Sequence, residues 1–309
     1  MIIAILLFVL VITCVNRTFL TGDNIFNVLR ATGFTLLTTI GITLVLISGG
    51  LDLSVGSVYA LGGTVCAKCL VNGLPIAVSI AAGILCGLFV GAVNGLIIVK
   101  LNIPPLIVTL GMMYVARGIV YVLTQGVPVY PLPDNFKVLE QKSLIGQIPN
   151  VVILALILAF AINVVMKRTP LGRAVYAVGG NPEAARISGI NVGKVKMFVY
   201  VLTGGLAALT GILMTARLGS AQATAGSGYE MTVIAAAIIG GTSTYAGVGT
   251  ILGSILGALF MEILSNSLTL MRISVYWQNI VIGVVLVVAV IIDTYRRILM
   301  RRKELGKTK

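Results

Sequence analysis

The feature of this sequence that most constrains its fold is a series of apolar runs, most of them close to the length that crosses a lipid bilayer. Ten runs can be drawn, at 2–16, 31–50, 54–72, 76–99, 104–124, 149–166, 197–217, 229–246, 249–270 and 276–294. Because a membrane-spanning helix needs about 20 apolar residues, ten helices occupy roughly 200 positions. The pattern predicts an all-α integral membrane protein, a single domain over residues 1–309 with about ten transmembrane helices.

The composition agrees with this prediction and excludes several other classes of protein. Hydrophobic residues make up 58% of the chain and charged residues only 10%, against roughly 45–50% and about 25% in soluble domains. A soluble enzyme and a disordered chain are therefore excluded. An outer-membrane barrel is also excluded, because its strands alternate apolar and polar residues and have much weaker hydropathy.

Residues that commonly bind metals or carry out catalysis are scarce. The chain has no histidine, which excludes imidazole metal sites and Ser-His-Asp catalysis. Its cysteines all lie in apolar runs, and they are Cys14, Cys66, Cys69 and Cys86. Cys66 and Cys69 have the spacing of metal ligands, but no second pair or histidine completes a tetrahedral site. We therefore expect helix-packing thiols, and we predict no metal, no cofactor and no catalytic residue.

The net charge of +13 is concentrated in two stretches of the chain. Residues 167–196 contain six Lys or Arg and one acid, and residues 296–309 contain seven and one, so together they carry eleven of the thirteen charges. Blocks of Lys and Arg beside membrane spans mark the cytoplasmic side. With an even number of runs before and between these blocks, we predict that both the N- and the C-terminus are cytoplasmic. The basicity is thus a topology signal, and we expect no nucleic-acid partner.

Glycine spacing indicates an internal repeat. Glycines recur every fourth residue in the fourth run and again in the ninth, namely Gly83, Gly87, Gly91 and Gly95, then Gly249, Gly253 and Gly257. Such a stripe lets a second helix backbone approach closely. Because the two runs are five segments apart, the halves, about 31–124 and 197–294, would have opposite orientations, as in many transporters. The alternative is that glycine is simply frequent in membrane helices.

The basic loop 167–196 predicts a short capped helix of about two turns. Asn181 suits the N-cap, Pro182 the first helical position and Glu183 the positive end of the helix dipole, while Gly189 supplies the stop. So short a helix is marginal alone, so its exposed face should dock onto a partner or the membrane surface. A solvated connecting loop is the alternative.

The chain carries no phosphate-binding loop of its own. The nearest approach to a Walker A sequence lies at 189–195, one residue short and without the Ser or Thr. Any nucleotide hydrolysis therefore belongs to another chain.

Two breaks interrupt the apolar pattern and are candidates for a gate. Their residues are Gly49, Gly50, Asp52 and Ser54 in the first break and Gly240 and Gly241 in the second. Asp52 or Ser54 can cap the following helix. A charged aspartate at the bilayer centre costs roughly 2.5–3.5 kcal/mol, so Asp52 should lie at an interface or in a polar cavity. Capping alone and a contact with a gate or partner remain alternatives for Asp52. Broken helices at matching places in two halves often bound a pathway.

Few polar groups within the runs are available for a substrate pathway. They are Asn94, Thr109, Glu230, Glu262, Asn266 and Gln278. Glu230 lies near a predicted helix start, where the dipole favours an acid. Glu262 lies deeper, but a proton-driven carrier usually exchanges protons between a buried acid and basic partners. Neutral amides and hydroxyls suit an uncharged polyhydroxylated solute, although bonding between helices is the alternative role for each residue.

Three segments carry a family resemblance that extends from about Thr18 to Asp293. They are Ser48–Gly63, Gly179–Val192 and Gly226–Ala258, and they resemble the ribose-type permeases of bacterial ABC sugar importers. The resemblance implies a ten-span, multi-pass permease in the lipid of the inner membrane. Its partners would be a second permease subunit, a cytoplasmic ATP-binding subunit and a periplasmic or lipid-anchored sugar-binding protein.

In such permeases a Glu-Ala-Ala-x-x-x-Gly element forms the helix that couples to the ATPase. Glu183, Ala184 and Ala185 followed by Gly189 match it, in agreement with the capping pattern. The resemblance thus implies an importer of a ribose-like pentose or a hexose. A permease for nucleosides, autoinducer-like sugars or branched-chain amino acids is one alternative, and an ion-coupled secondary carrier is another. A membrane-embedded enzyme is a more distant one.

Overall fold

The computed structural model describes residues 1–243 and 247–306, and no strand occurs among them. Seven helices are long and apolar enough to cross a membrane, and these are α2 (Gly22–Ile47), α4 (Ile76–Lys100), α5 (Pro105–Thr124), α7 (Asn150–Arg168), α10 (Val192–Leu218), α12 (Ile251–Leu270) and α13 (Val275–Gly306). The predicted all-α membrane architecture is confirmed at this level.

The remaining helices are shorter. Three are apolar and correspond to the other predicted runs, namely α1 (Ile2–Val15), α3 (Val55–Val71) and α11 (Tyr229–Ile239). The others are the 3-10 turn η1 (Arg17–Leu20), α6 (Asp134–Gln141), α8 (Pro170–Gly180) and α9 (Pro182–Ile187). The eighth run was predicted to extend to residue 246, and this is wrong, because α11 ends at Ile239 where Gly240 and the positive φ of Gly241 turn the chain.

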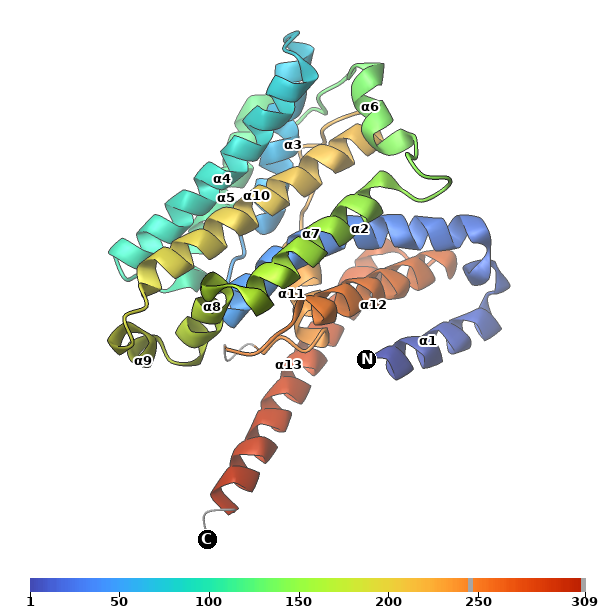
Figure 1. The fold of residues 1–309 in the computed structure, drawn as a ribbon. Coiled ribbons are helices and arrows are strands. Elements are labelled where there is room, and N and C mark those ends of the chain that lie inside the picture. Colours follow the sequence, from blue (N-terminus) through green and yellow to red (C-terminus); the bar gives the residue numbers. More distant parts are fainter. Residues whose placement is uncertain (244–246, 307–309) are drawn as a thin grey trace.

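The centre of the molecule is built from α2 and α10 (Figure 1). In the most apolar stretch of α2, 89% of the residues are buried, whereas no residue is buried in the most apolar stretch of α13. α4 packs against α10 and α3, and α12 packs against α2 and α11. α3 contacts α10 and α5 as well, and α11 contacts α2 and α13. The other helices surround this core, with α13 extending away from the main body.

Both glycine stripes mark close contacts between helices. A Cβ on Gly87 would clash with the carbonyl oxygen of Gly204 in α10, and one on Gly91 would clash with that of Tyr200. In the second stripe, a Cβ on Gly257 would clash with the carbonyl oxygen of Ala236 in α11. Inside lipid, where apolar burial does not hold helices together, this close packing of backbones stabilises their association.

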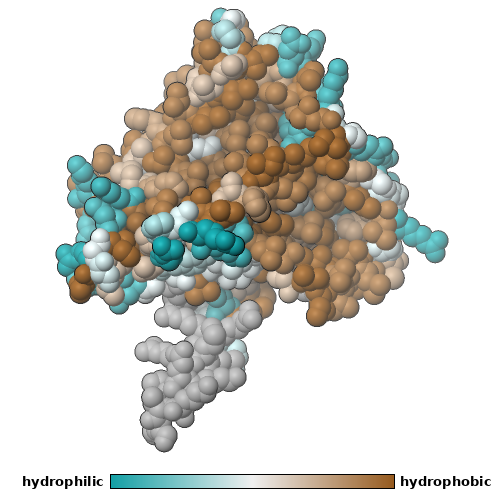
Figure 2. All heavy atoms as spheres, viewed as in Figure 1, coloured by the Kyte–Doolittle hydropathy of each residue, from teal (hydrophilic) through white to brown (hydrophobic). Residues whose placement is uncertain are grey.

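The surface agrees with a membrane environment. Apolar side chains cover most of the face shown in Figure 2, and hydrophilic residues gather along its margins. Exposed large apolar residues occur on the outward sides of several helices, for example Phe89, Val122, Phe160 and Tyr276. A water-soluble protein rarely exposes apolar patches of this extent.

Candidate functional site

The first break is the linker of residues 48–54 between α2 and α3, and its residues 52–54 are buried. The positive φ of Gly49 ends α2, and the amide of Gly50 donates back to the carbonyl of Val45 at 2.9 Å. The carbonyl oxygen of Leu51 accepts hydrogen bonds from the hydroxyls of Tyr200 at 3.2 Å and Thr109 at 3.4 Å. The linker is thus held by α10 on one side and α5 on the other.

Asp52, Ser54 and Asn94 form one chain of hydrogen bonds at this linker. The Oδ1 atom of Asp52 accepts from the amide of Ser54 at 2.8 Å and from its hydroxyl at 2.6 Å. Asn94 of α4 donates in turn to the Ser54 hydroxyl at 3.0 Å. Asp52 is only 2% exposed, so its side chain orders the backbone immediately before α3. The structure therefore brings together residues that the sequence placed in two separate groups.

A second linker, residues 219–228, joins α10 to α11 and approaches the first turn of α3. A Cβ on Gly56 would clash with the carbonyl oxygen of Gly226, and a Cβ on Gly226 with that of Gly56. Beside this contact the rings of Tyr59 and Tyr229 lie 5.2 Å apart. The N-terminal ends of α3 and α11 therefore contact each other, with the start of α3 buried and the start of α11 half-buried.

Arg117 of α5 clamps the second linker to α3. Its guanidinium donates to the carbonyl oxygens of Ala223 at 3.0 Å, Ala225 at 2.7 Å and Gly56 at 3.4 Å. Glu230, the second residue of α11, is close enough to interact electrostatically with Arg117. Arg117 was not among the site residues predicted from the sequence. The available signal was an arginine in the middle of an apolar run, where ionisable residues are rare and usually functional.

A cavity of about 530 Å³ lies between the second linker and α13. Residues from the linker and from the start of α11 form one wall, and Asn279, Ile282 and Gly283 of α13 form the other. Asn279 is exposed although it lies within an apolar span. Polar groups at this depth favour a water-filled space or a protein partner over lipid.

The other predicted pathway residues lie apart from these linkers and join helices. Glu262 of α12 accepts a hydrogen bond from Thr35 of α2 at 2.5 Å. Asn266 and Asn24 exchange two hydrogen bonds, at 3.0 and 2.9 Å. Gln278 of α13 donates to the hydroxyl of Thr269 in α12 at 3.3 Å and to the carbonyl oxygen of Ile273 at 3.0 Å. These bonds hold α12 against α2 and the start of α13.

The predicted short helix of the basic loop is formed by α9. Asn181 caps it, since its side chain accepts from the amides of Glu183 and Ala184, both at 3.0 Å. Ala185 is buried, whereas Ile187 is 80% exposed. Gly189 has a φ of +82° and ends the helix. The helix therefore rests on the protein with one face and leaves the other open.

The preceding helix, α8, connects α9 to both helix breaks. A Cβ on Gly179 would clash with the carbonyl oxygen of Ile47, the last residue of α2. The same oxygen accepts from the amide of Gly247 at 2.8 Å. Tyr176 of α8 donates to the carbonyl oxygen of Gly249 at 2.8 Å. Through these contacts α8 links α9 to the end of α2 and to the residues just before α12.

Comparison with known proteins identifies the family. Residues 24–290 match the family described as the branched-chain amino acid transport system / permease component. This chain belongs to that permease family. The ribose import permease protein RbsC of Escherichia coli (strain K12) is 41% identical over 303 residues, covering 96% of this chain and 93% of the relative.

Two further relatives of the permease transport other sugars, as their names state. The D-allose transport system permease protein AlsC of Escherichia coli (strain K12) is 37% identical and covers 89% of this chain and 84% of the relative. The galactose/methyl galactoside import permease protein MglC of Haemophilus influenzae is 33% identical, with 93% and 90% covered. No solved structure matches the chain significantly.

The permease is therefore a multi-pass transport subunit of the inner membrane. The predicted resemblance to ribose-type ABC permeases is confirmed by these relatives. In an importer of this family a separate ATPase subunit hydrolyses ATP, and a substrate-binding protein is a further partner. Family membership favours the importer over the ion-coupled carrier and the membrane enzyme.

Proposed function

We propose that this permease imports a monosaccharide, either a ribose-like pentose or a hexose. The observation that carries the proposal is that relatives covering almost the whole chain are named for ribose, allose and galactose. The groups around the two linkers agree with it, since amides, hydroxyls and backbone carbonyls suit an uncharged polyhydroxylated solute.

A branched-chain amino acid is the second candidate substrate, because the family description names it. A nucleoside or an autoinducer-like sugar requires the same test. The complex purified from its native membrane is reconstituted into liposomes with ATP, and uptake of labelled ribose, allose, galactose, a nucleoside and leucine is compared. Uptake of one monosaccharide in preference to leucine supports the proposal, and uptake of leucine alone refutes it.

Ten membrane crossings with both termini in the cytoplasm fit this function. α3 and α11 are shorter than a bilayer requires, but each is preceded by a linker inside the protein that extends its path. Both basic blocks then lie on one side, as the distribution of Lys and Arg favours. Reporter fusions after residues 143 and 188 test this topology, since they should report opposite sides.

The helix contacts support an inverted repeat with halves of about 31–124 and 197–294. Exchanging α2 with α10, α3 with α11, α4 with α12 and α5 with α13 converts the contacts of one half into those of the other. Under this exchange the counterpart of linker 48–54 is linker 219–228. The sequence pattern had instead suggested the break at Gly240 and Gly241 as the counterpart of linker 48–54. Under the exchange, the break at Gly240 and Gly241, between α11 and α12, corresponds to the turn between α3 and α4.

We place the sugar pathway where the two linkers bring the starts of α3 and α11 together. Discontinuous helices that end near the bilayer midplane form the binding sites of many transporters. α13 forms one wall of the cavity beside Asn279, and no residue in the apolar stretch of this helix is buried. A second permease subunit that covers this side would close the pathway, and the homo- and heterodimer are both compatible with it. Asn94, Thr109 and Asp52 border the first linker, whereas Glu262, Asn266 and Gln278 would support the frame.

We propose further that α9 couples the permease to the ATPase. The coupling residues are Asn181, Pro182, Glu183, Ala184, Ala185 and Gly189. Glu183 pairs with Arg186 at 2.6 Å and both are exposed, so Glu183→Lys should change stability by no more than about 0.5 kcal/mol. It should nevertheless reduce uptake to background while the protein still inserts into the membrane. Normal uptake by Glu183→Lys contradicts the coupling role.

A further inference from the structure

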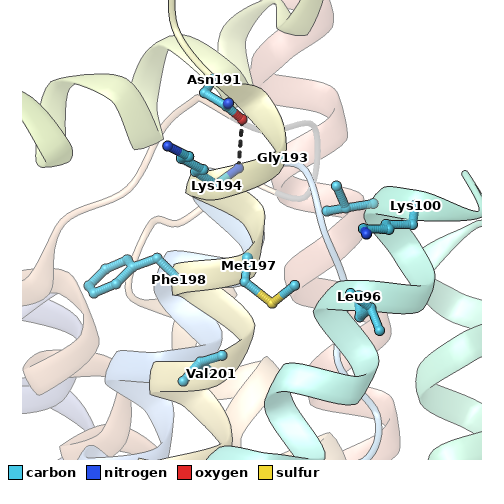
Figure 3. Close-up of a pocket in the computed structure, with 9 residues that line it drawn as sticks. Leu96, Lys100, Asn191, Gly193, Lys194, Met197, Phe198 and Val201 are labelled. Atoms are coloured by element: carbon cyan, nitrogen blue, oxygen red, sulfur yellow. Dashed lines mark hydrogen bonds between the residues drawn. The ribbon is translucent and has the colours of Figure 1, made fainter.

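A shallow groove of about 440 Å³ runs between the last turns of α4 and the first turns of α10 (Figure 3). Met197 and Val201 form its floor, Leu96 and Lys100 lie along one edge, and Lys194 and Phe198 along the other. It lies outside both linkers and outside the α9 surface. The groove therefore belongs to no site described above.

The backbone holds the two edges of this groove at a fixed separation. A Cβ on Gly193 would lie 2.7 Å from a methyl carbon of Val99, and one on Gly95 would lie 2.9 Å from the sulfur of Met197. Glycine at both positions thus allows the start of α10 to rest directly on the end of α4. The groove is thus shaped by the close packing of the start of α10 on the end of α4.

One end of the groove is positive and its floor is apolar. Lys100 and Lys194 are both exposed, and neither forms an ion pair among the described residues, in contrast to Lys137 with Asp134 and Arg186 with Glu183. Leu96 is exposed beside them. An amphipathic anion matches this arrangement, with its charge at the lysines and its apolar part on the floor.

Lys194 is the more informative of the two lysines. Lys100 ends α4, where the negative end of the helix dipole favours a cation. Lys194 instead lies in the first turn of α10, where the dipole is positive and disfavours it, and Asn191 already caps its amide at 2.9 Å. Local helix stability therefore gives no reason for a lysine at this position, whereas an anion held there interacts favourably with both the side chain and the dipole.

We propose that this groove binds one anionic phospholipid. The phosphate lies at the lysine end and an acyl chain lies along Met197, Phe198 and Val201. The amino group of Lys194 points away from α4 in Figure 3, and its exposed four-carbon stem reaches the groove by a change of rotamer. Because α10 begins three residues after Gly189, the lipid adjoins the end of the α9 segment.

The test is a titration of the full-length, detergent-purified permease with phosphatidylglycerol, followed by native mass spectrometry. Phosphatidylglycerol should bind with one high-affinity site per chain, and phosphatidylcholine with the same acyl chains should bind much more weakly. Equal binding of the two lipids overturns the proposal. Displacement of the lipid by excess inorganic phosphate would also overturn it, because the site would then be a simple anion site.

Two double variants test whether the lysine charges at the groove contribute to lipid binding. Because each basic side chain near an anionic lipid contributes about fivefold, Lys100→Gln with Lys194→Gln should weaken phosphatidylglycerol binding about thirtyfold. The control is Lys167→Gln with Arg168→Gln, an exposed basic pair at the end of α7 that removes the same charge and should leave the affinity unchanged. Equal losses in the two double variants overturn the proposal.

A third variant, Val201→Trp, keeps both lysines and fills the floor of the groove. It should also weaken phosphatidylglycerol binding, and unchanged affinity overturns the assignment of the acyl chain to this floor. All variants are first checked for an unchanged thermal unfolding midpoint.

Discussion

In the inverted repeat proposed above, the linker 48–54 and the linker 219–228 are counterparts, yet they are built differently. The first is short, its residues 52–54 are buried, and Asp52 bonds to Ser54 within it. The second is longer, borders a cavity of about 530 Å³, and is held by Arg117 of α5. The proposed repeat thus pairs a largely buried linker with one that borders a cavity.

The outer helices α5 and α13 also differ in how much of each is buried. α5 contacts α3 and supplies Arg117 to the centre, whereas its counterpart α13 is unburied along its apolar stretch. The short helix α6, in the connection between the halves, lies against the end of α10, where Gln141 donates to the carbonyl of Arg217 at 3.2 Å. It therefore covers the start of the second linker.

The largest effect is expected where the halves should behave alike, at the glycine stripes. Gly87→Leu would force a side chain into the backbone of Gly204, and Gly257→Leu into that of Ala236. Each should destabilise the protein by more than about 4 kcal/mol and abolish membrane accumulation. Gly111→Leu is the matched control, because nothing lies within 4 Å of a Cβ there. Western blots of membranes and thermal unfolding measure the outcome, and a tolerated Gly257→Leu would break the equivalence of the stripes.

The next effect concerns the clamp on the second linker. Arg117→Ala leaves the carbonyls of Ala223, Ala225 and Gly56 without their donor, which should cost about 2–3 kcal/mol and reduce uptake at least tenfold. Arg117→Lys retains the charge but not the fork of donors, so it should recover only part of the uptake. Wild-type uptake by Arg117→Ala would show that the second linker holds its position without the clamp.

The first linker should respond less, because Tyr200, Thr109 and Asn94 still bond to it when the Asp52 carboxylate is removed. Asp52→Ala removes the acceptor of the Ser54 amide and should lower stability by about 1–2 kcal/mol. Asp52→Asn keeps an acceptor oxygen and should stay within about 0.5 kcal/mol of wild type, with most of its uptake retained. Thermal unfolding and uptake are measured together. Loss of uptake by a stable Asp52→Asn would assign a gating role to the charge and reverse the comparison.

The smallest expected effect is a pH dependence of stability. It arises in α6, the helix that covers the start of the second linker. Burial raises the pKa of Glu140 in α6 from its ordinary value of 4.5 to about 7, and nearby Arg30 and Arg217 partly oppose this. Because the folded state holds the proton more tightly, stability is greatest below pH 4.5 and falls as the pH rises to about 7.

Glu140→Gln should therefore reduce the stability difference between pH 5 and pH 8 by on the order of 1 kcal/mol. Thermal unfolding at the two pH values measures it, and Glu183→Gln, at an exposed site on the same chain, is the control. An identical pH dependence in wild type and Glu140→Gln would show that this carboxyl group is ionised without cost in the folded protein.

Local patterns in the sequence predicted features that depend on neighbouring residues. The N-cap at Asn181 and the stop at Gly189 predicted α9, since both act within one turn of helix. The fourfold spacing of Gly87 and Gly91 predicted a close helix contact, because spacing alone puts these residues on one face. The partner of that face, α10, was not predictable, since a bare glycine stripe accepts any backbone.

The hydrogen-bond partners of the predicted pathway residues depend on how the helices pack. Asn94 and Asp52 were assigned to different groups because they lie 42 positions apart, and only the packing of α4 on the first linker joins them through Ser54. Glu262 was chosen for its depth in an apolar run, and the structure shows it bonded to Thr35 between two helices. A polar residue in an apolar run has a hydrogen-bond partner, but the sequence of the run does not identify that partner.

The sequence by itself determined that this chain is a helical membrane protein, where its helices lie, and which short segment is capped for docking. Those properties follow from hydrophobic length, charge distribution and local hydrogen bonding, which act over one helix or less. Tertiary structure alone decided that the starts of α3 and α11 contact each other and that Arg117 binds the linker 219–228. A buried carbonyl oxygen needs a hydrogen-bond donor, and the residue that supplies it is set by the fold and not by the local sequence.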